Sequence, residues 1–317
     1  AYAIVSYQTA WLKAHYPAHF MAATMSSDMD KTDKVVTFIE ECRTMKLKLL
    51  PPDVNSGEFH FTVDDAGRII YGLGAIKGLG EGPVESIISA RNQGGPFKDL
   101  FDFCARVDPR KVNKRALEAI IRSGAADRLG PTYDSVNHLI DHDRAVMFAA
   151  MGEAVKTAEQ ATANSNAGMM DLFGAVIADD DSSKDVYADF RRTRTWTMKE
   201  RLNAEKETLG LYLTGHPIDE YESELEHLVT SRIANLKPEK GNQTIAGLII
   251  SQRLVKTKRG DNMAIVTLDD RTGRMDVTIF AETFNNARDV LLKDGLLIIN
   301  GQVRYDDFSG MLKMSAE

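Results

Sequence analysis

Cysteine and long apolar runs are scarce in this sequence, and each scarcity excludes a class of protein. Only two cysteines occur among 317 residues, Cys42 and Cys104, and their spacing suits neither a disulfide framework nor a metal site. This usage favours a reducing compartment, and we expect the cytoplasm. No apolar run approaches the roughly 20 residues that a membrane-spanning helix needs, and no signal peptide opens the sequence. We therefore expect no membrane partner.

The sequence also lacks an excess of positive charge and a set of convergent catalytic groups. The net charge is -7 at pH 7, so any affinity for nucleic acid must come from local basic patches. Asp28 and Asp30 have the spacing of a two-metal carboxylate pair, but capping of the next helix by Asp30 is the better interpretation. His138 and His142 could share a helix face, without a third zinc ligand. The sequence predicts neither a catalytic nor a metal site.

Glycine is concentrated in one place. Five glycines and Lys77 lie in the run from Gly72 to Pro83, between a strand-like and a helix-like segment. A helix that begins near Pro83 would direct unpaired N–H groups at an anion, and glycine lets a ligand approach the backbone. The spacing fits neither a Walker A loop nor a dinucleotide fingerprint. The run resembles the hairpin of a helix-hairpin-helix motif, which would hold nucleic-acid backbone without reading its sequence.

A turn that only lets two helices pack closely is the alternative for this run. If the hairpin interpretation is right, the residues that contact the phosphate are Lys77, Gly78, Gly80 and Gly82.

A basic cluster lies within a predicted helical block over 97–105, 112–122 and 135–150. Only Asp108 opposes the cluster in its own window. We expect these side chains to neutralise phosphates, with a solvated helix face as the alternative. The cluster contains Arg106 and four residues that we assign to DNA binding: Arg110, Lys111, Lys114 and Arg115.

The sequence predicts further helices and one hairpin outside this block. Two helices over 1–25 are divided by Pro17, a third spans 31–45, and strands over 59–63 and 68–71 form a hairpin. Another helix is predicted over 198–213, and it ends at Gly215.

The segment from about 157 to 189 is rich in Ala, Asn, Ser and Asp and predicts a flexible linker. It contains a short apolar stretch that could dock on a partner, with Leu172 and Phe173 as its anchors. A helix turn packed on its own domain is the alternative. The docking stretch consists of Met169, Met170, Asp171, Leu172 and Phe173.

The C-terminal quarter is rich in strands. Strands over 244–251, 263–268, 275–280, 296–303 and from 311, with a helix over 282–292, predict an OB-fold barrel. We assign Phe280 to the barrel interior. Stacking and charge on single-stranded nucleic acid are assigned to six residues: Arg253, Lys256, Lys258, Arg259, Tyr305 and Phe308.

Four runs together resemble bacterial DNA polymerase III alpha subunits, the C-family replicative polymerases. They are AYAIVSYQTAWLKAHYPAHFMA over 1–22, YGLGAIKGLGEGP over 71–83, SGAADRL over 123–129 and ETLGLYLTGHP over 207–217. The resemblance implies a multidomain α+β fold that is mainly helical. Its implied parts are the end of the fingers region (1–57), a tandem helix-hairpin-helix domain (58–156), a linker with a clamp-binding motif (157–197), a helical connector (198–240) and a truncated OB-fold domain (241–317).

The resemblance also implies function. The chain would grip duplex DNA and single-stranded template and would tether the sliding clamp for processive synthesis, alongside other subunits of the replicative holoenzyme. The family's Mg²⁺-binding palm aspartates lie upstream of these residues, so we expect no cofactor and no polymerase activity in this fragment. The family's clamp peptide usually opens with Gln, where this chain has Met169.

Two other functions stay open. A non-polymerase adaptor or repair scaffold could combine the same two modules, and a metal-dependent nuclease could use Asp28 and Asp30. Because the sequence begins with Ala1 and not Met, we expect a fragment of a longer chain.

Overall fold

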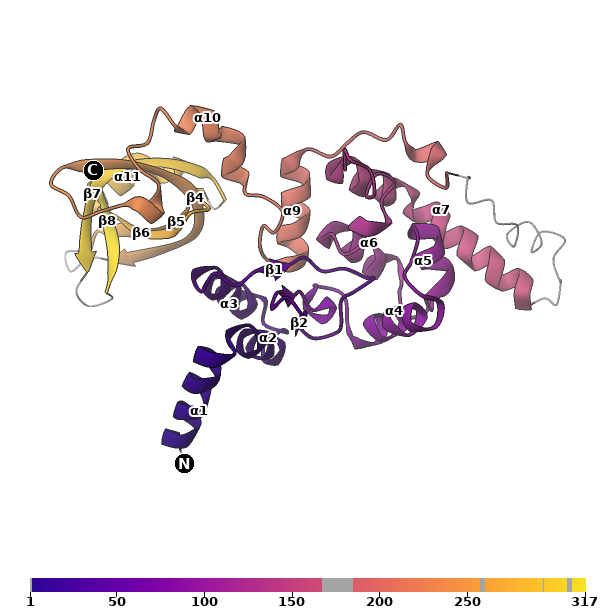
Figure 1. Ribbon diagram of the computed structural model, residues 1–317. Coiled ribbons are helices and arrows are strands. Elements are labelled where there is room, and N and C mark those ends of the chain that lie inside the picture. The colour runs from indigo at the N-terminus through magenta and orange to yellow at the C-terminus, as the bar shows by residue number, and fades with distance from the viewer. Residues whose placement is uncertain (1, 167–184, 257–259, 293, 307–309) are drawn as a thin grey trace. The chain divides into compact units, whose positions relative to one another are not determined.

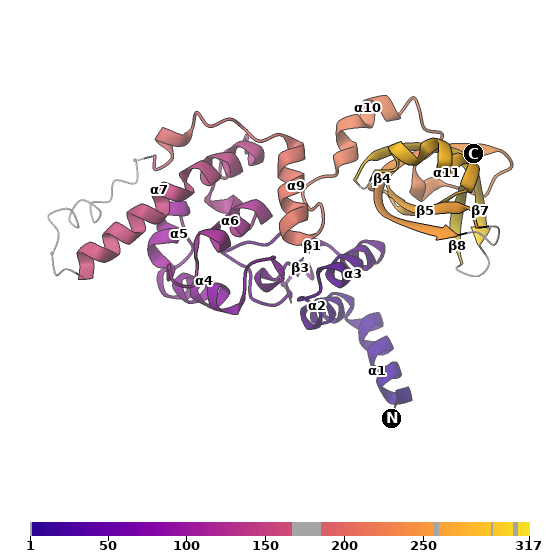
Figure 2. The ribbon, with the colours of Figure 1, turned by 180° about the vertical axis from the view of Figure 1, so that it is seen from behind.

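The computed structural model describes residues 2–166, 185–256, 260–292, 294–306 and 310–317. The chain divides into two compact units, Ala1–Thr214 and Gly215–Glu317. The first is mainly helical and the second is built on a β-barrel (Figures 1 and 2). The predicted multidomain α+β class is therefore confirmed, while the division falls inside the segment 198–240 that the sequence assigned to a connector.

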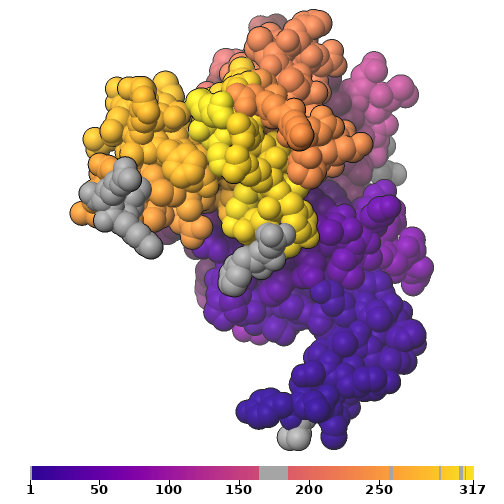
Figure 3. All heavy atoms as spheres, turned by 90° about the vertical axis from the view of Figure 1, so that its left-hand side faces the viewer, coloured from indigo at the N-terminus to yellow at the C-terminus, as the bar shows by residue number. Residues whose placement is uncertain are grey.

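Three helices open the first unit: α1 (Tyr2–His15), α2 (Pro17–Ser27) and α3 (Thr32–Thr44). Pro17 divides the first two as predicted, because it tolerates only the first turn of a helix, where its missing N–H is not needed. The apolar faces of α2 and α3 pack into the core through Met21, Met25 and Ile39. In contrast, α1 buries no side chain and projects as an arm from its unit (Figure 3).

The predicted cap of α3 is wrong. Lys31, not Asp30, occupies the N-cap, and no side chain caps the helix there. The turn before α3 instead directs Asp28 toward two lysines, with Oδ1 2.6 Å from Lys31 Nζ and Oδ2 3.1 Å from Lys34 Nζ. These hydrogen bonds lower the pKa of Asp28. The carboxylate is therefore engaged by lysines, which speaks against a two-metal pair with Asp30.

A small sheet follows, made of β1 (Leu49–Leu50), β2 (Thr62–Val63) and β3 (Ile69–Ile70). The antiparallel pair β2 and β3 confirms the predicted hairpin, although both strands are shorter than expected. Asp64 closes its turn by accepting the backbone N–H groups of Ala66 and Arg68. The parallel pairing of β1 with β3 had no signal in the sequence, because two residues carry no periodicity.

The helical block contains η1 (Leu73–Ala75), α4 (Glu81–Gly94), α5 (Leu100–Arg106), α6 (Lys114–Ser123), η2 (Asp127–Leu129) and α7 (Ile140–Asn166). Helix α7 begins five residues after the predicted start at 135 and continues to Asn166, into the segment expected to be a linker. Its buried Val146, Ala150, Ala154 and Ala158 recur every fourth residue, which explains why the helix continues.

The chain downstream of residue 184 packs on this block. The buried Tyr187 hydroxyl donates to Leu129 O at 2.6 Å and accepts the Leu100 N–H at 2.9 Å. After η3 (Ala188–Phe190), a capping box of Thr197 and Glu200 starts α9 (Met198–Leu209). This helix ends at Gly210 in the left-handed conformation, five residues before the predicted stop.

One buried ion network joins three of these elements. Arg144 on α7 is 1% exposed. Its guanidinium donates to Asp127 Oδ1 and Oδ2 at 2.7 and 2.8 Å and to Glu205 Oε1 on α9 at 2.9 Å. Burial works to lower the pKa of Arg144, but the two carboxylates outweigh it and raise that pKa, so Arg144 stays charged. A Cβ at Gly124 would lie 2.2 Å from Arg144 Nη2, which explains the glycine of the SGAADRL run.

We predict that Arg144→Met lowers the free energy of unfolding of the first unit by about 3–5 kcal/mol, because two carboxylates would lose their buried cation. Both tryptophans, Trp11 and Trp196, lie in this unit, so urea unfolding followed by tryptophan fluorescence measures it selectively.

The matched control is Arg43→Met, which removes an exposed pair with Glu40 and should cost less than about 1 kcal/mol. Equal losses in the two variants would show that the buried network stabilises the unit no more than an exposed ion pair does.

The second unit is a closed five-stranded barrel with strand order β4-β5-β6-β8-β7. Strands β6 and β8 are parallel and the other neighbours are antiparallel. The strands are β4 (Asn242–Lys256), β5 (Asn262–Asp269), β6 (Arg274–Ile279), β7 (Leu296–Asp306) and β8 (Met311–Ala316), with α11 (Ala281–Ala287) between β6 and β7. The helix between the third and fourth strands confirms the predicted OB-type architecture.

Short helical turns surround the barrel: η4 (Pro217–Tyr221), α10 (Glu222–Leu225), η5 (Ile233–Asn235) and η6 (Arg288–Val290). Asp269 at the end of β5 accepts from Arg274 Nε at 2.9 Å and lies 3.4 Å from His216 Nε2. Burial works to raise the pKa of Asp269, but these partners outweigh it and lower that pKa. The His216-Pro217 end of the ETLGLYLTGHP run is thereby fixed to the barrel.

Candidate nucleic-acid interface

The glycines of the first hairpin have two different roles. A Cβ at Gly72 would lie 2.7 Å from the backbone of His60, and one at Gly74 would lie 2.6 Å from the Phe59 ring. These two glycines permit close packing inside the domain. Gly78 has φ +88°, which a side chain would disfavour, and so it makes the turn before α4.

Gly80 and Gly82 face open space, since a Cβ at either would meet no atom within 4 Å. Gly80 is the N-cap of α4, and Lys77 is exposed beside it. The backbone here is open to a ligand, as the phosphate interpretation requires. However, Glu81 in the first turn of α4 opposes an anion, so Lys77 is the favourable charge of this hairpin.

A second hairpin precedes α6, and Asp108 shapes it. The Asp108 carbonyl accepts the N–H groups of Lys111 and Val112 at 3.0 and 2.9 Å, and its Oδ1 accepts that of Arg110 at 2.9 Å. Asn113 then caps α6 by accepting the Ala116 N–H at 3.0 Å. The single acidic residue of the basic cluster is thus used to form the turn.

The cations of the second hairpin are available to a partner. The side chains of Arg110, Lys111, Lys114 and Arg115 are exposed, and none makes an ion pair with another described residue. Helix α6 has no acidic residue in its first turn. Its positive dipole end and four cations therefore act together on an anion.

The two hairpins lie close together. The N–H of Asp108 donates to Ser86 Oγ on α4 at 2.9 Å. A Cβ at Gly78 would lie 4.0 Å from Ala119 Cβ, which is one helical turn after Arg115. The N–H of Lys77 donates to Thr208 O on α9 at 2.9 Å. Both hairpins and α9 are thus packed against one another.

Arg106, which the sequence included in the basic cluster, has a structural role instead. Its guanidinium pairs with Asp102 at 2.9 Å, donates to Ala90 O and Gly95 O, and lies over the Phe97 ring. These contacts join α4 to α5.

In the barrel, the predicted single-strand residues lie beside two loops. Arg253 and Lys256 are exposed on the last residues of strand β4, which continues to Lys256, beyond the predicted strand over 244–251. Tyr305 near the end of β7 is 58% exposed. The β4–β5 and β7–β8 loops that these residues flank are the loops by which OB barrels bind oligonucleotides. Lys258, Arg259 and Phe308 lie outside the described residues.

Two apolar side chains of this region are exposed, although the sequence did not predict it. Phe280 was assigned to the barrel interior, but it is 52% exposed at the N-cap of α11, and Phe284 fills the core instead. Leu254 on β4 is 60% exposed between Arg253 and Lys256, and its strand position alone gave no reason to expect this.

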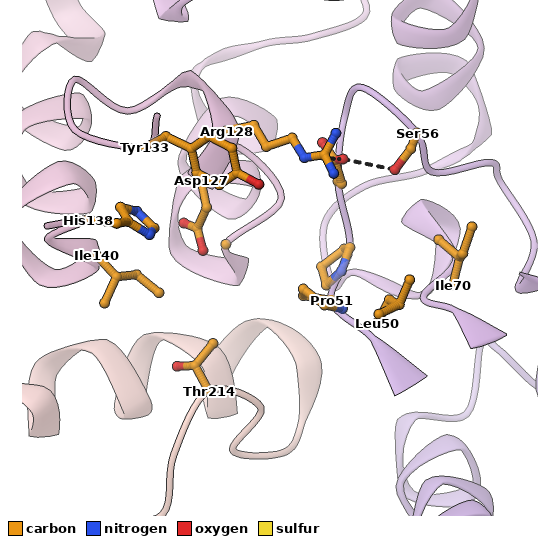
Figure 4. A pocket seen from close by; sticks show the side chains of 13 residues that line it. Leu50, Pro51, Ser56, Ile70, Asp127, Arg128, Tyr133, His138, Ile140 and Thr214 are labelled. Carbon is orange, nitrogen blue, oxygen red and sulfur yellow. Dashed lines mark hydrogen bonds and ion pairs between the residues drawn. The ribbon is translucent and has the colours of Figure 1, made fainter. Parts of the chain in front are cut away.

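The first unit also contains a pocket of about 350 Å³ (Figure 4). Leu50 and Ile70 of the small sheet face Tyr133 and His138 across it. Its polar groups are mutually engaged: Asp53 Oδ2 accepts from Ser56 Oγ at 2.8 Å and lies 3.2 Å from Arg128 Nε. We assign it no ligand.

The two histidines do not form the predicted pair. His138 precedes α7, so it does not share a helix face with His142, and it lies 3.6 Å from Asp143. Among the described residues, no cluster of three His, Cys, Asp or Glu side chains could hold a metal. The residues predicted to bind the clamp, Met169, Met170, Asp171, Leu172 and Phe173, lie outside the described part of the chain. In that described part, no helix is long and apolar enough to span a membrane.

Comparison with known families agrees with this geometry. A family model described as a helix-hairpin-helix motif matches residues 46–135, which include both hairpins. A second, an OB-fold nucleic acid binding domain, matches residues 243–317. The fold and the two surfaces therefore define a protein that combines two nucleic-acid-binding modules.

The relatives are more specific. The chain is 56% identical to DNA polymerase III subunit alpha of Pseudomonas aeruginosa, 51% to that of Vibrio cholerae and 50% to that of Escherichia coli K12. Each match covers 100% of this chain and 26–27% of the relative. The resemblance to bacterial DNA polymerase III alpha subunits is thus confirmed over the whole chain, which spans about a quarter of the length of these relatives.

Proposed function

We propose that this chain is the DNA-binding and clamp-binding portion of a replicative DNA polymerase III alpha subunit. The two hairpins hold the backbone of duplex DNA, and the barrel contacts single-stranded template through Arg253, Lys256 and Tyr305. The stretch from Met169 to Phe173 tethers the sliding clamp, so that the polymerase remains on its template.

One observation carries the duplex assignment. Four exposed cations without an ion pair lie at the start of α6, although the chain as a whole has a charge of -7. Holding several like charges near the positive end of one helix is unfavourable without an anion. A DNA backbone supplies that anion, and the release of its counterions favours binding.

The activity of the whole protein is part of the same proposal. As a DNA-directed DNA polymerase, it would use Mg²⁺ held by residues outside this chain and would act in the cytoplasm with the other holoenzyme subunits. The whole-chain likeness to polymerase subunits supports this function over an adaptor or repair scaffold with the same modules.

We predict that the double variant Lys111→Glu with Lys114→Glu weakens duplex binding equally for different sequences, because phosphate contacts carry no sequence information. The slope of log affinity against log salt should flatten by about 0.9 for each lost contact, and so by about 1.8. Fluorescence anisotropy of labelled duplexes at several salt concentrations measures both quantities.

The charge-matched control is Lys46→Glu with Lys48→Glu, two exposed residues of the same unit that belong to neither hairpin. It should leave the slope unchanged. A slope in the α6 variant equal to that of the unmodified chain would contradict the assignment.

A separate prediction concerns the clamp. Leu172→Ala with Phe173→Ala should reduce clamp affinity at least about tenfold, because anchors of this kind carry most of the energy of a docking peptide. Surface plasmon resonance with immobilised clamp measures this, while duplex affinity should not change.

Asp179→Ala with Asp180→Ala is the control, because it alters the same segment but not its apolar residues. Unchanged clamp affinity in the Leu172 and Phe173 variant would rule out this stretch as the tether.

A further inference from the structure

A basic and aromatic patch lies outside both modules. The segment 190–201 contains five cationic residues and one acidic residue, Glu200. It joins η3 to α9 on the surface of the first unit. Neither hairpin nor barrel strand belongs to it.

Three of these five cations have carboxylate partners. Arg191 pairs with Asp185, and Arg194 binds both oxygens of Glu200, at 3.0 and 2.6 Å. Arg201 is largely buried and donates to Asp141 at 2.7 Å. The remaining two, Arg192 and Lys199, are exposed and make no ion pair with a described residue. The patch therefore keeps two unneutralised positive charges.

Trp196 lies between these two cations in sequence and forms an aromatic pair with Phe148 of α7. The Trp196 ring contacts Phe148 of α7 edge to face, with centroids 5.7 Å apart and planes inclined by 61°. Phe148 is 36% exposed and Trp196 is half-buried. A backbone bond from Trp196 N to Asp141 O at 3.3 Å holds the segment against α7. The pair offers a fixed aromatic face at the surface.

A recess of about 410 Å³ adjoins this pair. It is lined by His138, Leu139, Ile140, Asp141, His142 and Thr195. His142 Nδ1 lies 3.2 Å from Thr195 Oγ1 across it, and these groups can exchange hydrogen bonds with the edge of a ring. Thr195 and Asp141 connect the recess directly to Trp196.

We propose that this patch is an additional contact for single-stranded DNA, with a base against Trp196 and Phe148 and flanking phosphates on Arg192 and Lys199. Unstacked bases offer the ring faces that a partly exposed aromatic pair and a recess of this size can take, whereas bases in a duplex are stacked on one another. The inference rests on the proposed function only in taking DNA as the ligand, since neither hairpin nor barrel takes part.

Trp196 itself reports on the site. The variant Trp11→Phe leaves Trp196 as the single tryptophan of the 317 residues. Titration of this variant with a thymidine oligonucleotide should quench its fluorescence to saturation, because the base stacks on the indole. For a duplex of equal length, the dissociation constant read from the quenching should be at least about tenfold higher.

In the Trp11→Phe background, Arg192→Glu with Lys199→Glu should raise the dissociation constant read from this quenching at least about tenfold. It should also flatten the salt slope by about 1.4, the sum of two single-strand phosphate contacts. Phe148→Ala should weaken binding at least about fivefold through lost stacking. The neutral pair Arg192→Gln with Lys199→Gln, which perturbs folding less, should give an intermediate loss.

Two controls separate this inference from the proposed function. Lys46→Glu with Lys48→Glu should leave the quenching unchanged. Lys111→Glu with Lys114→Glu should weaken duplex binding but keep the Trp196 response, so the hairpin assignment is tested independently. The inference is overturned if saturating single strands do not quench Trp196, if the Arg192 and Lys199 variants bind as tightly as the control, or if duplex quenches equally well.

Discussion

The first unit depends on the buried cation Arg144. Burying a guanidinium is costly unless carboxylates of good geometry surround it, and Asp127 and Glu205 supply that geometry from two other elements. Because Glu205 also accepts the N–H groups of Leu213 and Thr214, the network fixes the chain after α9 as well. The network therefore fixes the positions of η2, α7 and α9 relative to one another.

This arrangement determines where the nucleic-acid surface lies. Gly124, which must lack a side chain next to Arg144, ends α6, and α6 carries the exposed cations at its other end. Helix α9 accepts the Lys77 N–H of the first hairpin through Thr208. A charge buried in the core thus positions the charges that lie free at the surface. An acidic chain can bind an anion in this way, because a buried cation such as Arg144 is neutralised by carboxylates while a cluster of cations at the surface has no ion pair with a described residue.

Much of the fold could be predicted from sequence because its signals are local. Pro17 divides two helices wherever the chain goes, Asp64 to Gly67 is turn chemistry, and alternation such as Met275, Val277 and Ile279 marks a barrel strand. The failures depend on tertiary context. Asp30 had the right residue type for a cap, but lysines that follow Asp28 fix the turn one residue later. Phe280 has the composition of a core residue, yet α11 begins there and leaves Phe284 to fill the barrel.

Part of the candidate site could also be predicted from the sequence. The basic cluster in the sequence contained the four cations that the structure leaves exposed before and at the start of α6. Arg106 is the exception, because two of its partners are carbonyls distant in sequence. The patch around Trp196 could not be recognised, because which of its cations stay unpaired depends on Asp185, Asp141 and the neighbouring α7.

We propose that this acidic chain holds DNA by its backbone through a few unpaired cations. The most direct test is the affinity of the unmodified chain for two duplexes of unrelated sequence, measured by anisotropy between about 50 and 200 mM salt. We predict equal affinities for the two duplexes and a common log–log slope of about -4.5, from the five exposed cations of the two hairpins. Binding that does not respond to salt, or that differs strongly between the two sequences, would contradict the account.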